Sequence, residues 1–243
     1  MQNIMDAPAP RFISHRGFQP MAPANSLPSF RYAGALRQWA IETDVHRTRD
    51  DVLVCCHNDT VDATYNGTGA IKEMTWAELR ALSMNVGNRL DCLTEEEKRM
   101  PLFSEYLAIC KKYGSVPFLE LKTSDAGRVI EEVRRAGFEQ EEIVISSSKL
   151  DWLIESRRLA PKAFVHWIFA KEERLSELAA LGNAGLSWNI PDWSSRPVEK
   201  IALAHEHGLK VCLRAGDSVE AVQTMMEMGL DYIPTNCMHT ELL

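Results

Sequence analysis

The 243-residue sequence contains no long hydrophobic run and no basic amino-terminal segment followed by an apolar stretch. A membrane-spanning helix needs about 18 or more consecutive apolar residues, so no membrane span is predicted. The sequence shows no signal peptide either, and we therefore expect a soluble, cytoplasmic protein.

Positive charge is also scarce. Lys and Arg number 27 against 34 Asp and Glu, for a formal net charge of −7. Because nucleic acids and anionic membranes are bound through excess basic charge, we expect neither as a main partner. A small anionic substrate is still compatible with this balance, since local positive charge in a pocket can outweigh the sign of the whole chain. The sequence gives no indication of the oligomeric state.

The six cysteines show no Cys-x-x-Cys spacing, and we expect buried thiols instead of a set of structural disulfides. Aromatic residues make up 8% of the chain, but hydrophobic residues reach 45%, which is enough for a large core. This length and composition suit a single α/β barrel well.

No stretch rich in Pro, Gly and Ser divides the chain. We therefore expect one domain over residues 1–243, with an insertion at about 58–100. The second half alternates amphipathic and apolar segments, which predicts a parallel sheet covered by helices and favours the α/β class, as a closed TIM-type (β/α)8 barrel. The expected helices are 126–136, 150–160, 171–181, 197–207 and 218–228, and the expected strands are 143–146, 163–169, 185–189, 209–213 and 232–234.

The first half predicts a strand at 11–15 and a helix that Asn25 and Ser26 begin and that runs to about residue 38. A further helix begins after Thr75, where Glu78 completes a capping box. A helix at 101–113 and a strand at 116–122 follow.

The stretch from Glu42 to His57 concentrates the chemistry. Glu42 and Asp44 are two residues apart, so on a strand both carboxylates point to one face. The short link to the apolar run 52–56 predicts a hairpin, and a turn centred near Arg49 and Asp50 would place Glu42 opposite His57. Two carboxylates aimed at one point repel each other, which a divalent cation would relieve.

Several motifs occur in order along the chain: His15-Arg16-Gly17, Ala22-Pro23-Ala24-Asn25-Ser26-Leu27-Pro28-Ser29-Phe30, Ile41-Glu42-Thr43-Asp44-Val45, His57-Asn58-Asp59-Thr60-Val61-Asp62, Asn66-Gly67-Thr68-Gly69 and Leu119-Glu120-Leu121-Lys122. On these motifs the sequence resembles the glycerophosphodiester phosphodiesterase family, among the phospholipase-C-like phosphodiesterase barrels. The second half matches the family only in its strand–helix rhythm.

The resemblance implies hydrolysis of a glycerophosphodiester to glycerol phosphate and an alcohol, in lipid and glycerol metabolism, with Ca²⁺ or Mg²⁺ as cofactor. In the family, the glycerol hydroxyl beside the phosphate is thought to attack first and to form a cyclic phosphate that water opens. Carried over to this chain, the metal ligands are Glu42, Asp44 and Glu120, the acid–base pair is His15 and His57, and the phosphate contacts are Arg16 and Lys122.

The charges and the proton-transfer groups of these seven residues suit hydrolysis of a phosphodiester. Three carboxylates form a hard oxygen site that suits Ca²⁺ and Mg²⁺ equally. With the dication and a phosphodiester the charge is −2, which Arg16 and Lys122 neutralise. Two histidines, with ordinary pKa values near 6.5, can share proton transfer near neutral pH. Which one is the acid and which the base is left open at this point.

The chain departs from the family at several positions. Ala24 stands where Glu is usual, Asn58 where Asp is common, and Asn236 where the family has Asp. Leu213-Arg214-Ala215 replaces a late-strand Trp-Thr pattern. Because Arg214 adds a cation where the alcohol could lie, we expect a polar or anionic leaving group instead of choline.

Alternatives are a barrel that acts on another phosphodiester, such as a lysophospholipid or a sugar phosphodiester, a non-catalytic barrel that binds phosphorylated ligands, and a metal-dependent isomerase or aldolase. The isomerase or aldolase alternative gives no reason for paired histidines beside Arg16.

Two further sets of residues say less about function. The remaining histidines, at 46, 166, 205, 207 and 239, are expected to be structural or surface residues, and tryptophans 167, 188 and 193 either line the leaving-group pocket or pack in the core.

Overall fold

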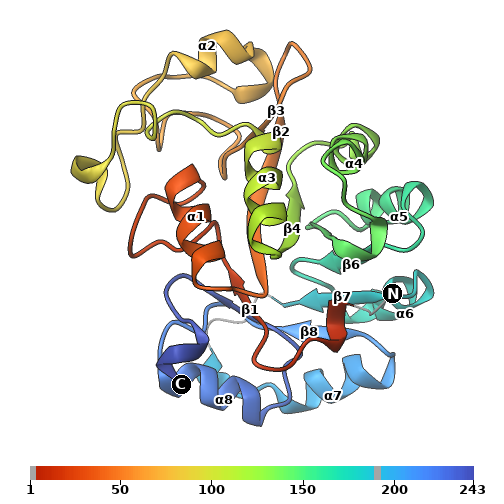
Figure 1. Cartoon of the computed structure of the whole chain (residues 1–243). Coiled ribbons are helices and arrows are strands. Elements are labelled where there is room, and N and C mark those ends of the chain that lie inside the picture. The colour runs from red at the N-terminus through yellow and green to blue at the C-terminus, as the bar shows by residue number, and fades with distance from the viewer. Residues whose placement is uncertain (1–3, 189–192) are drawn as a thin grey trace.

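Eight parallel strands form a nearly closed barrel in the computed structural model, which describes residues 4–188 and 193–243 (Figure 1). The strand order is β8-β7-β6-β5-β4-β2-β1-β9, and every pairing along it is parallel. At the seam between β8 and β9, the backbone N–H of Asp231 donates to the carbonyl of Val211 at 3.0 Å. The predicted TIM-type barrel is therefore confirmed. The strands are β1 (Phe12–Ser14), β2 (Ala40–Arg47), β3 (Leu53–Cys55), β4 (Val116–Leu121), β5 (Val144–Ser147), β6 (Phe164–Trp167), β7 (Ala184–Ser187), β8 (Lys210–Cys212) and β9 (Ile233–Thr235).

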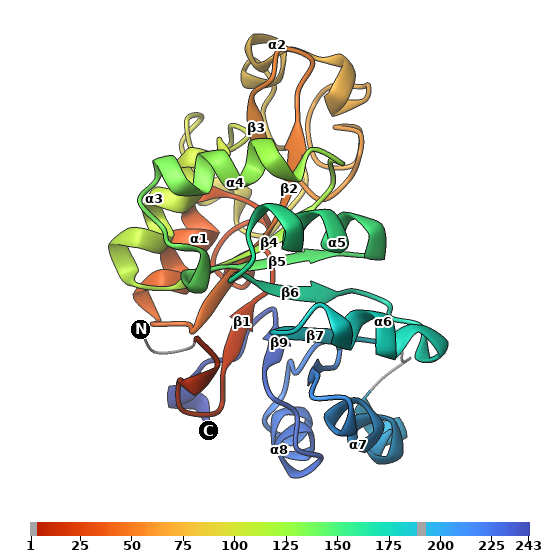
Figure 2. The same cartoon turned by 90° about the vertical axis from the view of Figure 1, so that its right-hand side faces the viewer.

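Helices cover the outside of the barrel, as Figure 2 shows for α3 to α8. Among the described residues, β9 is followed only by a 3₁₀ turn at Thr240–Leu242. The helices are α1 (Leu27–Ala35), α2 (Trp76–Arg80), α3 (Phe103–Tyr113), α4 (Ala126–Arg135), α5 (Leu150–Leu159), α6 (Leu175–Ala180), α7 (Val198–Glu206) and α8 (Val219–Glu227). No described helix is long and apolar enough to cross a membrane.

Local sequence explains where several helices begin and end. The Ser26 hydroxyl accepts the backbone N–H of Ser29 and so caps α1, while the backbone carries Asn25 in a left-handed conformation. Helix α1 ends at Ala35, three residues short of the prediction, because Arg37 also adopts a left-handed conformation with φ of 53°. The predicted helix 171–181 is interrupted by a 3₁₀ turn, and only Leu175–Ala180 is α-helical.

The β2–β3 hairpin forms, but its predicted register is wrong by one residue. Val45 pairs with Cys55, so β2 residue 42 would face residue 58 instead of His57. The cause is the turn: the carbonyl of Val52 accepts the backbone N–H of Thr48, and Asp51 takes a left-handed φ of 67°. The turn is therefore centred on Asp50, and His57 lies beyond the end of the ladder.

Residues 58–100 form a lobe that projects from the barrel together with the tip of the β2–β3 hairpin (Figure 1). The lobe has a hydrophobic cluster of its own, separate from the clusters inside and around the barrel. Its buried members are Val54, Cys56, Val61, Tyr65, Ile71, Leu79, Met84 and Met100. His57 lies directly between the last strand of the hairpin and this lobe.

Candidate active site

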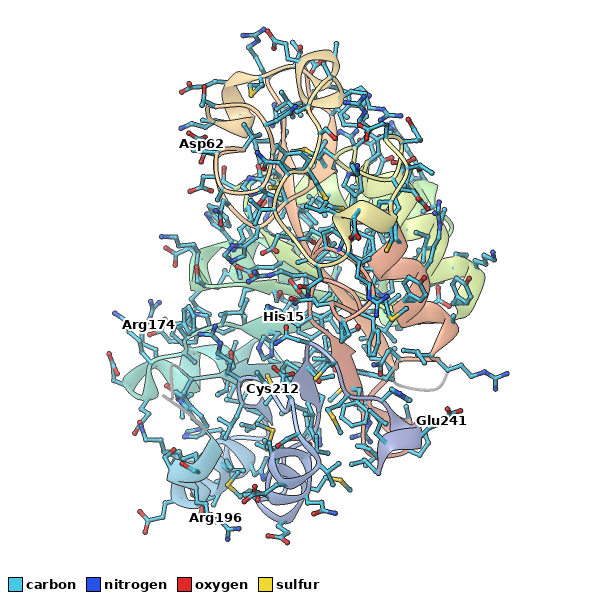
Figure 3. The ribbon with its side chains drawn as sticks, turned by 90° about the vertical axis from the view of Figure 1, so that its left-hand side faces the viewer. His15, Asp62, Arg174, Arg196, Cys212 and Glu241 are labelled. Atoms are coloured by element: carbon cyan, nitrogen blue, oxygen red, sulfur yellow. The ribbon has the colours of Figure 1, made fainter. Side chains whose placement is uncertain are left out.

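A cavity of about 710 Å³ opens at the carboxyl ends of the barrel strands, where active sites of such barrels lie. Figure 3 shows the side chain of His15 near the middle of the molecule, with Cys212, which lines the same cavity, below it in this view, and Asp62 on the side of the lobe. The sequence candidates that line the cavity are His15, Arg16, Glu42, His57, Glu120 and Lys122.

Three carboxylates converge beside this cavity. Asp44 on β2 is the register partner of Glu120 on β4, and Glu42 lies two residues earlier on the same face of β2. One oxygen from each of the three lies within 4.8 Å of the others. Ligand oxygens at 2.0–2.6 Å from a common cation lie within about 5 Å of one another, so the cluster fits Ca²⁺ or Mg²⁺.

Burial makes this cluster unfavourable without positive charge. Glu42 is 6% exposed and Asp44 is fully buried. Burial, and then the neighbouring Asp44 and Glu120, raise the pKa of Glu42 well above its usual value. Burial and Asp44 also raise the pKa of Glu120. Asp44 Oδ1 makes no hydrogen bond of good geometry, although the ammonium of Lys122 lies 3.2 Å away.

A tight turn after β1 brings Arg16 to the carboxylates. Arg16 and Gly17 both have positive φ, and a Cβ on Gly17 would meet the Ser29 hydroxyl at 2.3 Å, so only glycine fits there. The backbone N–H of Arg16 donates to Glu42 Oε2 at 2.8 Å, and its Nε lies 3.4 Å from Asp44 Oδ2.

Lys122 approaches the same carboxylates from β4, with its ammonium against both Asp44 and Glu120. Burial opposes the charge on Lys122, but these two carboxylates outweigh that effect and raise its pKa. Arg16 and Lys122 therefore both contact the acidic cluster.

Asn25 has a role that its sequence pattern did not indicate. Its side chain is 4% exposed, its Nδ2 donates to Asp44 Oδ2 at 2.9 Å, and its Oδ1 accepts the Thr43 hydroxyl at 2.7 Å. Asn25 was expected only to begin a helix, a function that Ser26 performs. The left-handed backbone turns the Asn25 side chain inward, where it orients Asp44.

The side-chain amide of Asn236 holds His15, and Asp217 fixes the orientation of that amide. Asp217 accepts from both the backbone N–H and the Nδ2 of Asn236, at 2.7 and 2.6 Å. Because a carboxylate can only accept, the Oδ1 of Asn236 must face His15, and it lies 2.9 Å from His15 Nδ1. Gln19 Nε2 donates to the same oxygen. His15, which lines the cavity, therefore carries its hydrogen on Nδ1, and its Nε2 is free of hydrogen.

The two histidines differ in their surroundings. Burial and the neighbouring Arg16 lower the pKa of His15 to about 4. His57 is exposed and lies where the cavity meets two further grooves, with its Nδ1 2.7 Å from Asn58 Oδ1. Burial also lowers the pKa of His57, against the opposing effect of Asp44.

His166 was expected to be structural or at the surface, and it is buried in the barrel interior, where it also lines the cavity. Its side chain is 2% exposed, and its Nδ1 lies 2.5 Å from the Tyr232 hydroxyl. Of the three tryptophans, Trp188 lines the cavity and Trp167 packs in the core. The side chain of Trp193 lies outside the described residues.

Buried His166 predicts a pH dependence of stability. Burial lowers the pKa of His166 to about 3. Between about pH 3 and 6.5, its imidazole is therefore protonated in the unfolded chain and neutral in the folded protein. Through this group the free energy of unfolding falls by about 1.4 kcal/mol per unit as pH falls in that window. His166→Gln, which cannot titrate, should show a shallower slope in denaturant unfolding at pH 7, 5.5 and 4.5. Equal slopes in the two proteins would contradict the prediction.

The family of the chain follows from its similarity to known proteins. The model of the glycerophosphoryl diester phosphodiesterase family matches residues 15–240, which is nearly the whole chain. The chain belongs to this family. Its resemblance to the family, noted from the motifs, is thereby confirmed.

Similar family members differ in how much of them is matched. Glycerophosphodiester phosphodiesterase of Caldanaerobacter subterraneus is 25% identical over 238 residues, 92% of this chain and 93% of that protein. Human glycerophosphodiester phosphodiesterase 1 is 33% identical over 110 residues, 45% of this chain, and the matched stretch spans only 33% of the human protein.

Solved structures share the fold. An Oleispira antarctica phosphodiesterase, in complex with the product sn-glycerol-3-phosphate, superposes with a TM-score of 0.83 at 24% identity, over 93% of each chain. A glycerophosphodiester phosphodiesterase of Agrobacterium tumefaciens gives 0.79 at 23% identity, over 93% of this chain and 96% of that one.

The departures from the family pattern lie around the cavity. Asn58 and Asn236 are the hydrogen-bond partners of His57 and His15. Ala24 lines a groove that adjoins His57, and Arg214 lines the cavity itself. None of these departures alters a carboxylate of the cluster or either histidine.

Proposed function

We propose that the protein hydrolyses a glycerophosphodiester to glycerol phosphate and an alcohol, with a divalent cation bound by Glu42, Asp44 and Glu120. The observation that carries this proposal is the position of the acidic cluster and both histidines around one cavity. Membership of the family and the product complex of the Oleispira relative support the substrate class.

The charges of the site suit a phosphodiester. The three carboxylates carry −3, and a dication with Arg16 and Lys122 brings the site to +1, which a phosphodiester anion neutralises. The bound cation would supply positive charge to the phosphoryl oxygens, as is general for metal-assisted phosphoryl chemistry. Arg16 and Lys122 bind and orient the same anion, and both side chains are already held in place against carboxylates.

The hydrogen bonds of the two histidines support the following division of the proton transfers. Since His15 Nδ1 donates to Asn236, its free Nε2 is the base that takes the proton from the attacking glycerol hydroxyl. That oxygen bonds to phosphorus, the bond to the alcohol oxygen breaks, and protonated His57 gives the leaving oxygen its proton. The cyclic phosphate is then opened by water, with His57 as base and His15 returning its proton to the ring oxygen.

We also propose that residues 1–243 act as one catalytic unit. The barrel supplies His15 and the three carboxylates, whereas His57 is carried at the edge of the lobe 58–100. Neither part alone holds both members of the proposed acid–base pair.

Removal of divalent ions should abolish activity. The metal-free protein, prepared with a chelator, should hydrolyse glycerophosphoglycerol at less than about one hundredth of the rate with the ion, because three buried carboxylates would repel the substrate anion. Added Ca²⁺ or Mg²⁺ should restore turnover, and comparison of the two ions identifies the better cofactor. Unchanged turnover in the chelated protein would contradict the metal site. Release of a cyclic phosphate, observed by ³¹P NMR, tests the two-step route.

A further inference from the structure

Arg214 is a cation of the cavity that has no partner within residues 4–188 and 193–243. It follows β8, its side chain is exposed, and it lines the same cavity as His15, His57 and the carboxylates. Among the described residues, no hydrogen bond or ion pair is found for its guanidinium.

The other charged groups of the cavity are already engaged. Arg16 lies against Asp44, and Lys122 against Asp44 and Glu120. Asp217, three residues after Arg214, accepts from the N–H and Nδ2 of Asn236 and from the Thr235 hydroxyl. The described part of the chain therefore offers Arg214 no partner, and a bound group can take that place.

A second donor of the cavity is also unused. Trp188 is 5% exposed and lines the cavity, and its buried indole N–H has no acceptor among the described residues. A buried N–H without an acceptor is unfavourable by about 1–3 kcal/mol, so ligand oxygens are expected to compensate for it. Together with Arg214, this makes the cavity rich in unmatched donors.

We infer that the alcohol part of the substrate carries a second anionic group, a carboxylate or a phosphate, which Arg214 binds. This inference rests on the proposed function. In the proposed site the phosphodiester is matched by Arg16, Lys122 and the cation, and glycerol contributes only hydroxyl groups. An anion beside Arg214 can therefore come only from the alcohol. The planar guanidinium suits both anions, because each offers two oxygens to its parallel N–H donors.

A neighbouring groove is an alternative place for the alcohol part of the substrate to bind. It shares His57, Glu120 and Lys122 with the cavity and is lined by Lys149, whose ammonium has no ion pair among the described residues. A comparison of variants at Arg214 and Lys149 therefore decides which side receives the anion.

The test uses two pairs of substrates that differ by one anion. Glycerophosphoserine differs from glycerophosphoethanolamine by a carboxylate, and bis(glycerophospho)glycerol differs from glycerophosphoglycerol by a glycerophosphate. We expect kcat/KM to be about tenfold higher for the anionic member of at least one pair, as for a charge-assisted hydrogen bond. The pair that shows the difference identifies the anion, and the difference should shrink at high salt.

In Arg214→Gln the preference should disappear, while kcat/KM for the uncharged-alcohol substrate glycerophosphoglycerol stays within about twofold of the unaltered protein. The matched control is Arg134→Gln, which removes the same charge from an exposed position on α4 and should keep the preference.

Three results would overturn the inference alone: equal kcat/KM within both pairs, an equal loss for all four substrates in Arg214→Gln, or a preference that Lys149→Gln removes and Arg214→Gln does not. Absence of turnover on all four substrates with Ca²⁺ and with Mg²⁺ would instead overturn the proposed function, and this inference with it.

Discussion

Replacing His57 or His15 with alanine is expected to lower kcat by about 10²–10⁴, because each loses one proton transfer of the proposed reaction. The folded structure should tolerate both changes. His57 is exposed, and His15→Ala removes one hydrogen bond to Asn236, worth about 1 kcal/mol of the free energy of unfolding. Steady-state kinetics with glycerophosphoglycerol, together with denaturant unfolding of each variant, measures both effects.

The control for these variants is His207→Ala, an exposed histidine at the end of α7. It should leave kcat unchanged. The double variant should lose less than the product of the two single losses if both residues act in the same step. Near-normal turnover in either single variant would remove that histidine from the mechanism.

Glu42→Gln is expected to separate metal binding from folding. The new amide oxygen can still accept the backbone N–H of Arg16, so the turn after β1 should persist. Loss of one ligand should lower kcat by at least about 10², in line with a step that needs charge stabilisation. It should also remove the stabilisation by the ion, which for the unaltered protein is about 2.7 kcal/mol at a hundredfold excess over Kd.

Without metal, the same variant should be more stable than the unaltered protein at neutral pH. The raised pKa of Glu42, caused by burial and then by Asp44 and Glu120, means that its contribution to stability is present at low pH and is lost as pH rises. Thermal unfolding with chelator and with Ca²⁺ or Mg²⁺ measures both effects, with the exposed Glu206→Gln as control. A Tm increase with metal as large as in the unaltered protein would mean that Glu42 is not a ligand.

Short-range patterns were enough to predict most of the barrel. The predicted strand 116–122 and helix 150–160 match β4 (Val116–Leu121) and α5 (Leu150–Leu159) almost to the residue. Strand alternation placed Glu42 and Asp44 on one face, because that relation depends on spacing alone. Their role as ligands, like those of the other site residues, stays a prediction.

Long-range partners could not be predicted. Asn25 reaches Asp44 because its backbone is left-handed, and Asn236 reaches His15 because β9 lies beside β1, 221 residues away along the chain. The hairpin register depends on which residues close the turn. The hydrogen bond between Thr48 and Val52 closes it one residue away from a pairing that would place residue 42 opposite His57. Such contacts form only when distant parts of the chain pack together, and the spacing of residues along the sequence does not predict which parts meet.

The separate hydrophobic cluster of the lobe has a consequence for how such an enzyme can diversify. His15 and the three carboxylates lie on or next to hydrogen-bonded strands of the barrel. His57, in contrast, lies at the edge of the lobe, whose hydrophobic cluster is separate from those of the barrel. Natural variation that lengthens, trims or repacks the lobe can therefore shift His57 while leaving the three carboxylates where they are.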